Sequence, residues 1–566
     1  MFPVRARFWT GAVLAAALPV AVSAGQSAKP VTPNQSAPQN AADAPPPRKP
    51  VDLNHYLDAA IRQEQRLIEL MRNFRPVIET YIQKEKPDPD AVSSPNADEY
   101  FLGRLDLTGN SPSVSAFDAG ESLKNKARKK VSKKVVKKSR SLEAIDFAQA
   151  VFPDMGHFDR QNYTFEFAHF ESLGEVHCAA FDVKPREDRG RGFIGRIWIE
   201  DRDFNIVRFT GTHVSRRAFH FDSWRLNTLG VRWLPAYIYT QESNSSDPGD
   251  HTLWFKAQTR IWGYDVRNAG DQREFAKRLT DTAPSADPKR HEASQDLNPE
   301  YSVGGTAYRP EDEVVERLQV AGLMASDGEV DQILEAVVNN LLVTNELDIA
   351  AVRCRVLLTT PLESFVVGRT IIVSRGLLDT LPDEATLAAV LAHELAHIVL
   401  KHPLESAAGM GERFSDLEIF SHFKFRFTAA QEAEADNKGL ELFAKSPYQG
   451  QQGKVALFAK ELQARSQQLP NLMRAKFGND FLSSHFVAMQ AANASERLQP
   501  KSLDQVAALP LGSRISVDPW SDRIAMLKAK PVRLDSAKEK IPLEVTPFFP
   551  YLKRMDQQEK SPAISQ

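Results

Sequence analysis

The sequence predicts an α+β protein in which an antiparallel β-sheet domain precedes a mainly helical domain. Between residues 142 and 265, apolar and polar residues alternate with a period of two, and Phe, Trp, Tyr, Val and Ile are frequent. This alternation is typical of strands with one buried face. From about residue 308 the pattern is mixed, with stretches at helical spacing among short apolar runs. The 566 residues leave room for two or three domains.

The charge balance and the cysteine count exclude several classes of protein. The chain has 71 Lys and Arg against 73 Asp and Glu, a formal net charge of -2, so the overall charge predicts no nucleic-acid partner. Cys178 and Cys354 are the only cysteines, which excludes a scaffold built from disulfides. We expect two buried free thiols, because they lie in segments assigned to different domains.

The first residues have the pattern of a secretory signal. Arg5 and Arg7 precede an apolar run over 11–22, and small residues follow at 22–24. The run is shorter than the roughly 20 residues that span a bilayer. We therefore expect export and cleavage of a signal peptide, with a retained N-terminal anchor as the alternative.

Composition and periodicity divide the chain into eight segments. Pro, Ala, Ser and Gln dominate the segment after the signal, a composition that cannot bury enough surface to fold. Apolar residues then recur at helical spacing as far as Phe74, and Pro76 would bend or restart that helix. The predicted segments are a signal peptide (1–24), a flexible linker (25–50), an amphipathic helix (51–86), a low-complexity and basic linker (87–141), an antiparallel β domain (142–265), a linker (266–305), a domain that carries the chemistry (306–530) and a C-terminal tail (531–566).

A basic run occupies residues 124–140 and holds ten Lys and Arg. Such a run could make peripheral contact with an anionic membrane surface or with cell-wall polymers. The alternative is a solvated basic linker, because no aromatic residue interleaves with the charges.

The β domain contains six strand-like runs. They resemble, loosely, the curved half-barrel sheets of bacterial lipoprotein carriers, which hold acyl chains. The alternative is a sheet packed on the helix that starts at Leu53, with no ligand. The expected strands are 176–183, 193–200, 204–214, 219–226, 231–242 and 252–262.

A candidate metal centre begins with the motif His393-Glu394-Leu395-Ala396-His397. The histidines are four residues apart on a helix predicted over 382–401, so both imidazoles project from one face and can share a metal. If the histidines were ordinary core residues, Glu394 beside them would be an unpaired buried acid. The motif therefore favours a metal site.

A catalytic zinc site uses three protein ligands and keeps one position open. A third histidine at the metzincin spacing is excluded, because residue 403 is Pro. A second helix, predicted over 428–445, carries Glu432 and Asp436 one turn apart. Glu432 suits the ligand role and Asp436 would orient a ligating imidazole, whereas Glu434, the competing ligand, faces another direction. This helix would approach its neighbour through three alanines: Ala429, Ala433 and Ala435.

Over about residues 310–445 the sequence resembles the zinc metallopeptidases of the HtpX, Oma and CAAX prenyl endopeptidase type, metallopeptidase family forty-eight. The likeness rests on Gly376-Leu377-Leu378, on the run from Leu391 to His397, and on Glu432 to Asp436 as the family's ExxAD pattern. It implies one zinc ion per chain, held by His393, His397 and Glu432, with Glu394 as general base. His402 is also typical of the family, and its place off the ligand face predicts a structural role.

Family members place a Ser-His-Pro segment, followed by Arg-Ile, where it steadies the oxyanion. Here Ser483-Ser484-His485 matches the beginning, but Phe486 replaces the proline. His485 is the candidate oxyanion stabiliser that the resemblance implies. Arg497 and Arg523 both remain open as its arginine partner.

Together these features predict a zinc-dependent metalloendopeptidase that hydrolyses unfolded or misassembled envelope proteins, as part of quality control in the periplasm or cell envelope. Zinc lowers the pKa of a coordinated water to about 7, and Glu394 would take its proton. An extended polypeptide would bind as an added strand along residues 365–373. Two alternatives stay open: a zinc-stabilised chaperone or binding protein that does not cleave, and a lipid or lipoprotein carrier acting through the β domain.

Overall fold

The computed structural model describes residues 52–86, 94–109, 111–117, 142–187, 192–228, 232–243, 253–264, 310–404, 414–499, 502, 505, 507–527 and 542–555. These residues all belong to one compact unit, Asp52–Gln566. The predicted signal peptide, the linkers 25–50 and 266–305 and the basic run 124–140 lie outside the described residues.

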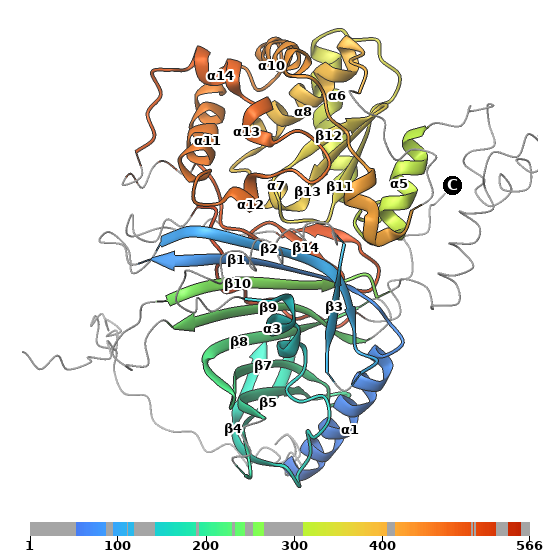
Figure 1. Cartoon of the computed structure of the whole chain (residues 1–566), viewed down its shortest axis with the longest axis vertical. Coiled ribbons are helices and arrows are strands. Elements are labelled where there is room, and N and C mark those ends of the chain that lie inside the picture. Colours follow the sequence, from blue (N-terminus) through green and yellow to red (C-terminus); the bar gives the residue numbers. More distant parts are fainter. Residues whose placement is uncertain are drawn as a thin grey trace, which may run out of the picture. The chain divides into compact units, whose positions relative to one another are not determined.

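A ten-stranded antiparallel sheet forms the first half of the described chain (Figure 1). Its strand order is β3-β2-β1-β10-β9-β8-β7-β6-β5-β4, so β1 pairs with β10 and every other pair joins consecutive strands. The strands are β1 (Val77–Lys86), β2 (Ser94–Asp106), β3 (Ser113–Ala116), β4 (Tyr163–Leu173), β5 (Val176–Pro185), β6 (Phe193–Glu200), β7 (Ile206–His213), β8 (Arg216–Asn227), β9 (Trp233–Ser243) and β10 (Leu253–Trp262).

The sheet corrects two of the predicted segments. The predicted helix over 51–86 is helical only as α1 (Leu53–Met71), and strand β1 follows Pro76. Both faces of β1 are buried, because Ile78 and Val77 belong to different core clusters, so the strand lacks the alternation that marks a half-exposed one. The predicted linker 87–141 contains β2 and β3, which extend the sheet beyond β1.

The six expected strands match β5 to β10 within three residues at each end, and the β4 strand before them was missed. One face of the sheet packs on α1, α3 (Ala144–Ala148) and the 3-10 turn η1 (Gln149–Val151). Phe147, Phe209 and Phe255 lie fully buried in this cluster. The prediction of a sheet packed on the first helix is therefore confirmed.

One buried ion pair fixes α1 on the sheet. Arg225 of β8 donates two hydrogen bonds to the Glu64 carboxylate of α1, at 2.6 and 2.7 Å, and a third to the carbonyl of Ile206 at 2.9 Å. Both side chains are almost fully buried. The surrounding core is aromatic, so either partner would carry an uncompensated charge without the other.

The second half of the described chain is mainly helical, and with the sheet it gives the predicted α+β class (Figure 1). A small mixed sheet has the order β11-β13-β12, with β11 parallel and β12 antiparallel to β13. The elements are α5 (Pro310–Val320), α6 (Glu329–Thr344), β11 (Arg353–Leu357), β12 (Ser364–Val367), β13 (Thr370–Ser374), α7 (Arg375–Thr380), α8 (Glu384–Leu400), η5 (Asp416–Glu418), α9 (Ile419–His422), α10 (Ala429–Ala444), α11 (Gln452–Arg465), α12 (Pro470–Met473), α13 (Phe481–Ser484), α14 (Val487–Ala492), β14 (Ile515–Val517) and β15 (Ile524–Met526).

Buried charged groups join the large sheet to the helical region. Glu79 of β1 accepts hydrogen bonds from Thr360 N at 2.6 Å and from Arg375 Nη2 at 2.6 Å. Asp98 of β2 accepts from the backbone N–H groups of Asn471 and Leu472, at 3.0 and 2.8 Å. Because these carboxylates are buried and multiply hydrogen-bonded, they hold β1 and β2 at fixed positions beneath α7 and α12.

The structure also corrects the predicted tail 531–566. Its residues 542–555 lie against the large sheet, where the Gln83 side chain bonds both Leu543 O and Val545 N at 2.8 Å. Farther along, Glu175 N donates to Leu552 O at 2.9 Å. Leu543, Val545 and Leu552 are buried, so this part of the segment belongs to the core.

Two further expectations concern thiols and membranes. Cys178 and Cys354 are both free and buried, as expected. Among the helices that the structure describes, none is both long and apolar enough to cross a bilayer.

The Glu64–Arg225 pair yields a stability prediction. Glu64→Gln leaves the Arg225 guanidinium buried without a counter-charge, so we expect a loss of about 3–5 kcal/mol in the free energy of unfolding. Denaturant unfolding measures it. Glu69→Gln, on the exposed face of the same helix, should change the free energy by less than about 0.5 kcal/mol, and equal effects of the two substitutions would contradict the role given to the pair.

Asp331 at the start of α6 yields a pH prediction. Burial, helped by the charge of Glu335, raises the pKa of Asp331 to about 7, against the opposing hydrogen bond from Gly328 N. Because folding favours the protonated acid, its contribution to stability is present below about pH 4 and is lost as pH rises towards 7. Asp331→Asn should therefore raise the melting temperature relative to the parent at pH 8 and not at pH 4. Asp348→Asn, at an exposed position of the same region, is the control, and a pH-independent difference for Asp331→Asn would contradict the burial argument.

Candidate metal centre

Helix α8 carries the HELAH motif through the interior. The Asp383 side chain caps it by accepting from Thr386 N at 2.9 Å, and Lys401 ends it in the left-handed conformation with φ of 54°. The expected helix 382–401 thus differs from α8 by one or two residues at each end. His393, Glu394 and His397 are each only 2% exposed, so any chemistry at these groups takes place out of bulk water.

Helix α10 brings the second part of the site against α8. Thr428 caps it and Gln431 completes a capping box. It approaches α8 closely at Gly439, where an added Cβ would lie 3.0 Å from His393 Cα. Of the three alanines predicted to make this contact, Ala435 is buried and the other two, Ala429 and Ala433, are exposed. A glycine one helical turn farther on makes the approach.

Three donor atoms converge between the two helices. His393 Nε2 lies 3.1 Å from Glu432 Oε2 and 3.2 Å from His397 Nε2, and His397 Nε2 lies 3.5 Å from Glu432 Oε2. Ligands bound tetrahedrally at about 2.0–2.1 Å from zinc stand about 3.3 Å apart. Two imidazole nitrogens at such a distance cannot both present lone pairs unless a proton or a cation lies between them. The donor set and its spacing therefore fit zinc.

The electrostatics of the site favour a cation at the same place. Burial lowers the pKa of His393, but the carboxylates of Asp436 and Glu432 outweigh it and raise that pKa to about 9. Burial raises the pKa of Glu432, but the two imidazoles outweigh it and lower that pKa to about 2. Positive charge is thus stabilised at the point where the donor atoms meet.

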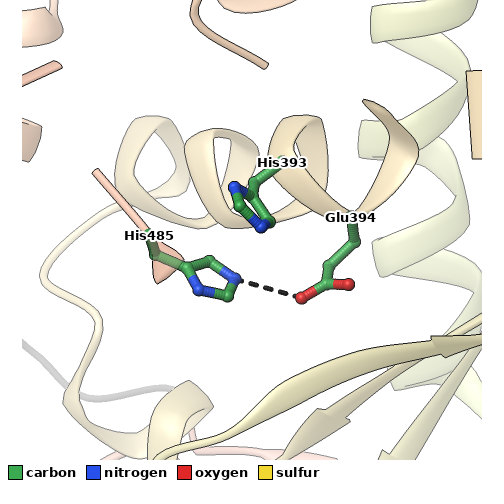
Figure 2. A group of neighbouring side chains, drawn as sticks. All are labelled: His393, Glu394 and His485. Atoms are coloured by element: carbon green, nitrogen blue, oxygen red, sulfur yellow. Dashed lines mark hydrogen bonds and ion pairs between the residues drawn. The ribbon is translucent and has the colours of Figure 1, made fainter. Parts of the chain in front are cut away.

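Glu394 lies beside the donor set in a network of its own. Its Oε1 accepts a hydrogen bond from Ser364 Oγ at 2.6 Å and lies 3.0 Å from His485 Nε2. Figure 2 shows the His485 ring directed at this carboxylate, with His393 between the two on the helix side. Burial raises the pKa of Glu394, but the His485 hydrogen bond and the neighbouring imidazoles bring that pKa below its ordinary value. Glu394 is held as a carboxylate that can accept a proton.

The structure places His485 inside the site. Its ring stacks on His393 with 4.0 Å between centroids, and Ser484 Oγ lies 2.8 Å from its Nδ1. In this conformation His485 Nε2 is hydrogen-bonded to Glu394, so the ring offers no free donor to an oxyanion. Arg497 and Arg523 are exposed and do not line the cavity.

Asp436 lies close to His393 and also supports the segment after His485. Its Oδ1 is 3.7 Å from His393 Nδ1, beyond hydrogen-bond distance. Its two oxygens accept from Phe486 N at 2.8 Å and from Ala488 N at 2.5 Å. Phe486 has φ of 65°, so this carboxylate fixes the turn that carries His485 into the site.

Two aromatic segments, 423–427 and 475–480, cover the site, and we call them the cover. The Phe427 ring stacks on His397 with 3.8 Å between centroids. The Asn479 side chain accepts from Phe427 N at 3.0 Å and donates to Phe427 O at 2.9 Å. Phe425 N donates to Phe477 O at 3.0 Å. The cavity left beneath the cover, beside the donor set and Glu394, has room for roughly one water molecule.

Strand β12 forms the edge of the small sheet next to this cavity. Ser364 and Phe365 of β12 line it, and Gly478 of the cover packs on Ser364, since an added Cβ would lie 3.1 Å from the Ser364 carbonyl oxygen. The sequence had indicated a strand edge over 365–373; the structure divides this run into β12 and β13, and β12 forms the edge.

The comparisons with known proteins bear on this half of the chain. Residues 325–421 match the model of Peptidase family M48. The match supports membership of this segment in that family, and it supports a metallopeptidase in general terms. The M48 match ends before Glu432 and His485, and the fold brings these two residues against the HELAH helix. A comparison with curated proteins finds no match.

Solved structures also match part of the chain. A LolA superfamily protein from Nitrosomonas europaea is 11% identical, with a TM-score of 0.21, over 38% of this chain and 93% of its own. An outer membrane lipoprotein-sorting protein domain from Vibrio parahaemolyticus is 12% identical, with a TM-score of 0.21, over 36% of this chain and 89% of its own. Likenesses of this size carry no argument about function.

The close approach of α10 to α8 yields a prediction. In Gly439→Ala the new methyl group meets the His393 backbone, so α10 must shift and carry Glu432 away from the imidazoles. We expect a stability loss of about 1–3 kcal/mol, measured by thermal unfolding, and weaker zinc binding, measured by chelator competition. Gly453→Ala, whose methyl would meet only the flexible Glu496 side chain, is the control. Unchanged zinc affinity in Gly439→Ala would show that the contact does not position Glu432.

Proposed function

We propose that this protein is a zinc-dependent metalloendopeptidase, with His393, His397 and Glu432 as zinc ligands and Glu394 as the general base. The observation that carries the proposal is the convergence of three donor atoms within 3.5 Å beside a buried, hydrogen-bonded carboxylate. The Peptidase family M48 match over residues 325–421 supports the same class of activity.

Each residue has a distinct task in this proposal. Zinc, when bound, would polarise the scissile carbonyl and lower the pKa of a coordinated water to about 7. The Glu394 carboxylate takes the proton of the attacking water and later delivers it to the leaving amine. Ser364 and His485 hold that carboxylate in place through its Oε1. His485 would steady the oxyanion after its bond to Glu394 is broken.

The substrate we propose is an extended stretch of an unfolded or misassembled envelope protein. Strand β12 is an edge strand of the small sheet and lies beside Glu394, buried beneath the cover. This position supports strand addition, in which the substrate backbone pairs with the edge strand once the cover has moved. The predicted signal peptide supports an envelope location. Because the cavity has room for about one water molecule, the cover must move away from β12 before a peptide reaches Glu394.

The two alternatives differ in what they require. A lipid or lipoprotein carrier needs space between the large sheet and α1, whereas among the described residues the buried side chains of the two pack together in one hydrophobic cluster. A zinc-stabilised binding protein needs no general base, whereas Glu394 is kept ionised at the donor set. The peptidase proposal accounts for more of the site.

The experiment that tests the proposal compares the parent protein with Glu394→Gln. Zinc is measured by elemental analysis, and cleavage of casein as an unfolded substrate is followed with and without chelator. We expect one zinc per chain in both proteins and cleavage about 100-fold to 10,000-fold slower in the variant. Glu384→Gln, at the other end of α8 and bonded to Tyr448, should cleave like the parent.

Other outcomes would count against the proposal in different ways. A parent protein without zinc would overturn the ligand assignment. Zinc in both proteins with no cleavage by either would favour the binding-protein alternative. Cleavage that survives in Glu394→Gln would remove the general base from the mechanism.

A further inference from the structure

Behind the donor set, the second ring nitrogen of His397 is engaged by other residues. His397 Nε2 faces the donor atoms, and its Nδ1 lies 3.1 Å from His402 Nδ1. On the other side of the His402 ring, Nε2 lies 3.2 Å from Glu434 Oε2. Three side chains thus form a continuous line that runs from the donor set to the protein surface.

Only one arrangement of protons satisfies this line when His397 is a ligand. A ligating Nε2 must present its lone pair, so His397 carries its proton on Nδ1 and donates it to His402. His402 Nδ1 must then accept, which places the His402 proton on Nε2. That N–H points at the Glu434 carboxylate, which can only accept. Each of the two contacts then has one donor and one acceptor, and both ring nitrogens of His402 are hydrogen-bonded.

We propose that His402 and Glu434 are positioning residues for the metal site, which hold His397 in the tautomer and orientation that bind zinc. The inference rests on the proposed function and deepens it. It replaces the structural role predicted for His402. It also gives Glu434, the competing ligand of the sequence analysis, a place behind both His402 and His397, two residues removed from the metal.

The local fold is built to make this line. Lys401 ends α8 with φ of 54°, and the chain turns so that His402 N donates to His397 O at 3.1 Å. The turn brings the two rings edge to face, with 5.1 Å between centroids. The His402 side chain is 7% exposed and that of Glu434 is 68% exposed. We therefore expect His402 to contribute more than Glu434, whose interaction is screened by water.

Helix α10 then has a separate use for each acid of its EAEAD motif. Glu432 reaches the donor set, Glu434 reaches His402, and Asp436 accepts from the backbone after His485. One helix thereby positions both histidines of α8 and the segment that carries His485.

The test measures zinc affinity, by competition with a chromogenic chelator, on metal-free protein reloaded with zinc. In His402→Ala we expect zinc binding about 10-fold to 100-fold weaker than in the parent. His402→Asn keeps an acceptor near the Nδ1 position and should recover part of that loss. Glu434→Gln should weaken binding by less than about tenfold. Glu441→Gln, an exposed acid on the same helix that pairs with Lys438, should bind zinc like the parent.

Thermal unfolding of the metal-free proteins separates positioning from a general loss of structure. Parent affinity in His402→Ala would overturn the proposal. The proposal would also be overturned if His402→Ala and His402→Asn lost equal zinc affinity and showed equal falls in melting temperature, because a purely structural role gives that result. A parent protein that binds no zinc would instead overturn the proposed function. If the parent binds zinc and cleaves casein, and His402→Ala binds zinc with the same affinity as the parent, only the positioning role is overturned.

Discussion

The site depends on three side-chain donor atoms brought within 3.5 Å of one another in the protein interior. Polar groups in such a place are costly unless they have partners, and the surrounding structure supplies partners to Glu394 and to His397 Nδ1. Glycine at position 439 lets the two helices approach, and the caps at Asp383 and Thr428 fix where each helix begins. The arrangement is rigid because packing and hydrogen bonds determine it together.

Two networks leave the donor set in different directions. On one side Ser364 and His485 converge on Glu394, and on the other His402 leads from His397 to the surface. The first network controls the group that would move a proton. The second fixes a group that would hold the metal. Substitutions in the two should therefore separate catalytic rate from metal affinity.

The large sheet is tied to the helical region by buried charges. Glu79 of β1 accepts hydrogen bonds from the loop between β11 and β12 and from α7, and the C-terminal residues 542–555 lie on the same large sheet. The helical region therefore folds against β1 and β2, and the sheet contributes to the stability of the half that bears the site. The cover lies over the other side of the site and leaves beneath it a cavity with room for roughly one water molecule.

The sequence by itself determined the candidate donor residues on two helices and much of the secondary structure. The spacing of His393 and His397 needs only a helix to bring their side chains together, and the Thr428 cap with Gln431 is a local signal. Period-two spacing with frequent Phe, Trp, Tyr, Val and Ile marked β5 to β10. Local rules of this kind involve residues a few positions apart, so they can be read without a fold.

Only the tertiary structure decided which distant groups meet. Strand β1 was not predicted, because burial on both faces removes the alternation. Strand β2 was not predicted either, because its sequence is polar and it becomes part of the sheet by pairing with β1. Ser364 and Gly439 carry no motif, and their roles come from contacts with partners 30 or more residues away. His402 lay off the ligand face by helical geometry, but α8 ends at Lys401, and the left-handed turn there returns its ring to His397. Contacts of this kind depend on how helices pack and end, which the spacing of residues along one element does not specify.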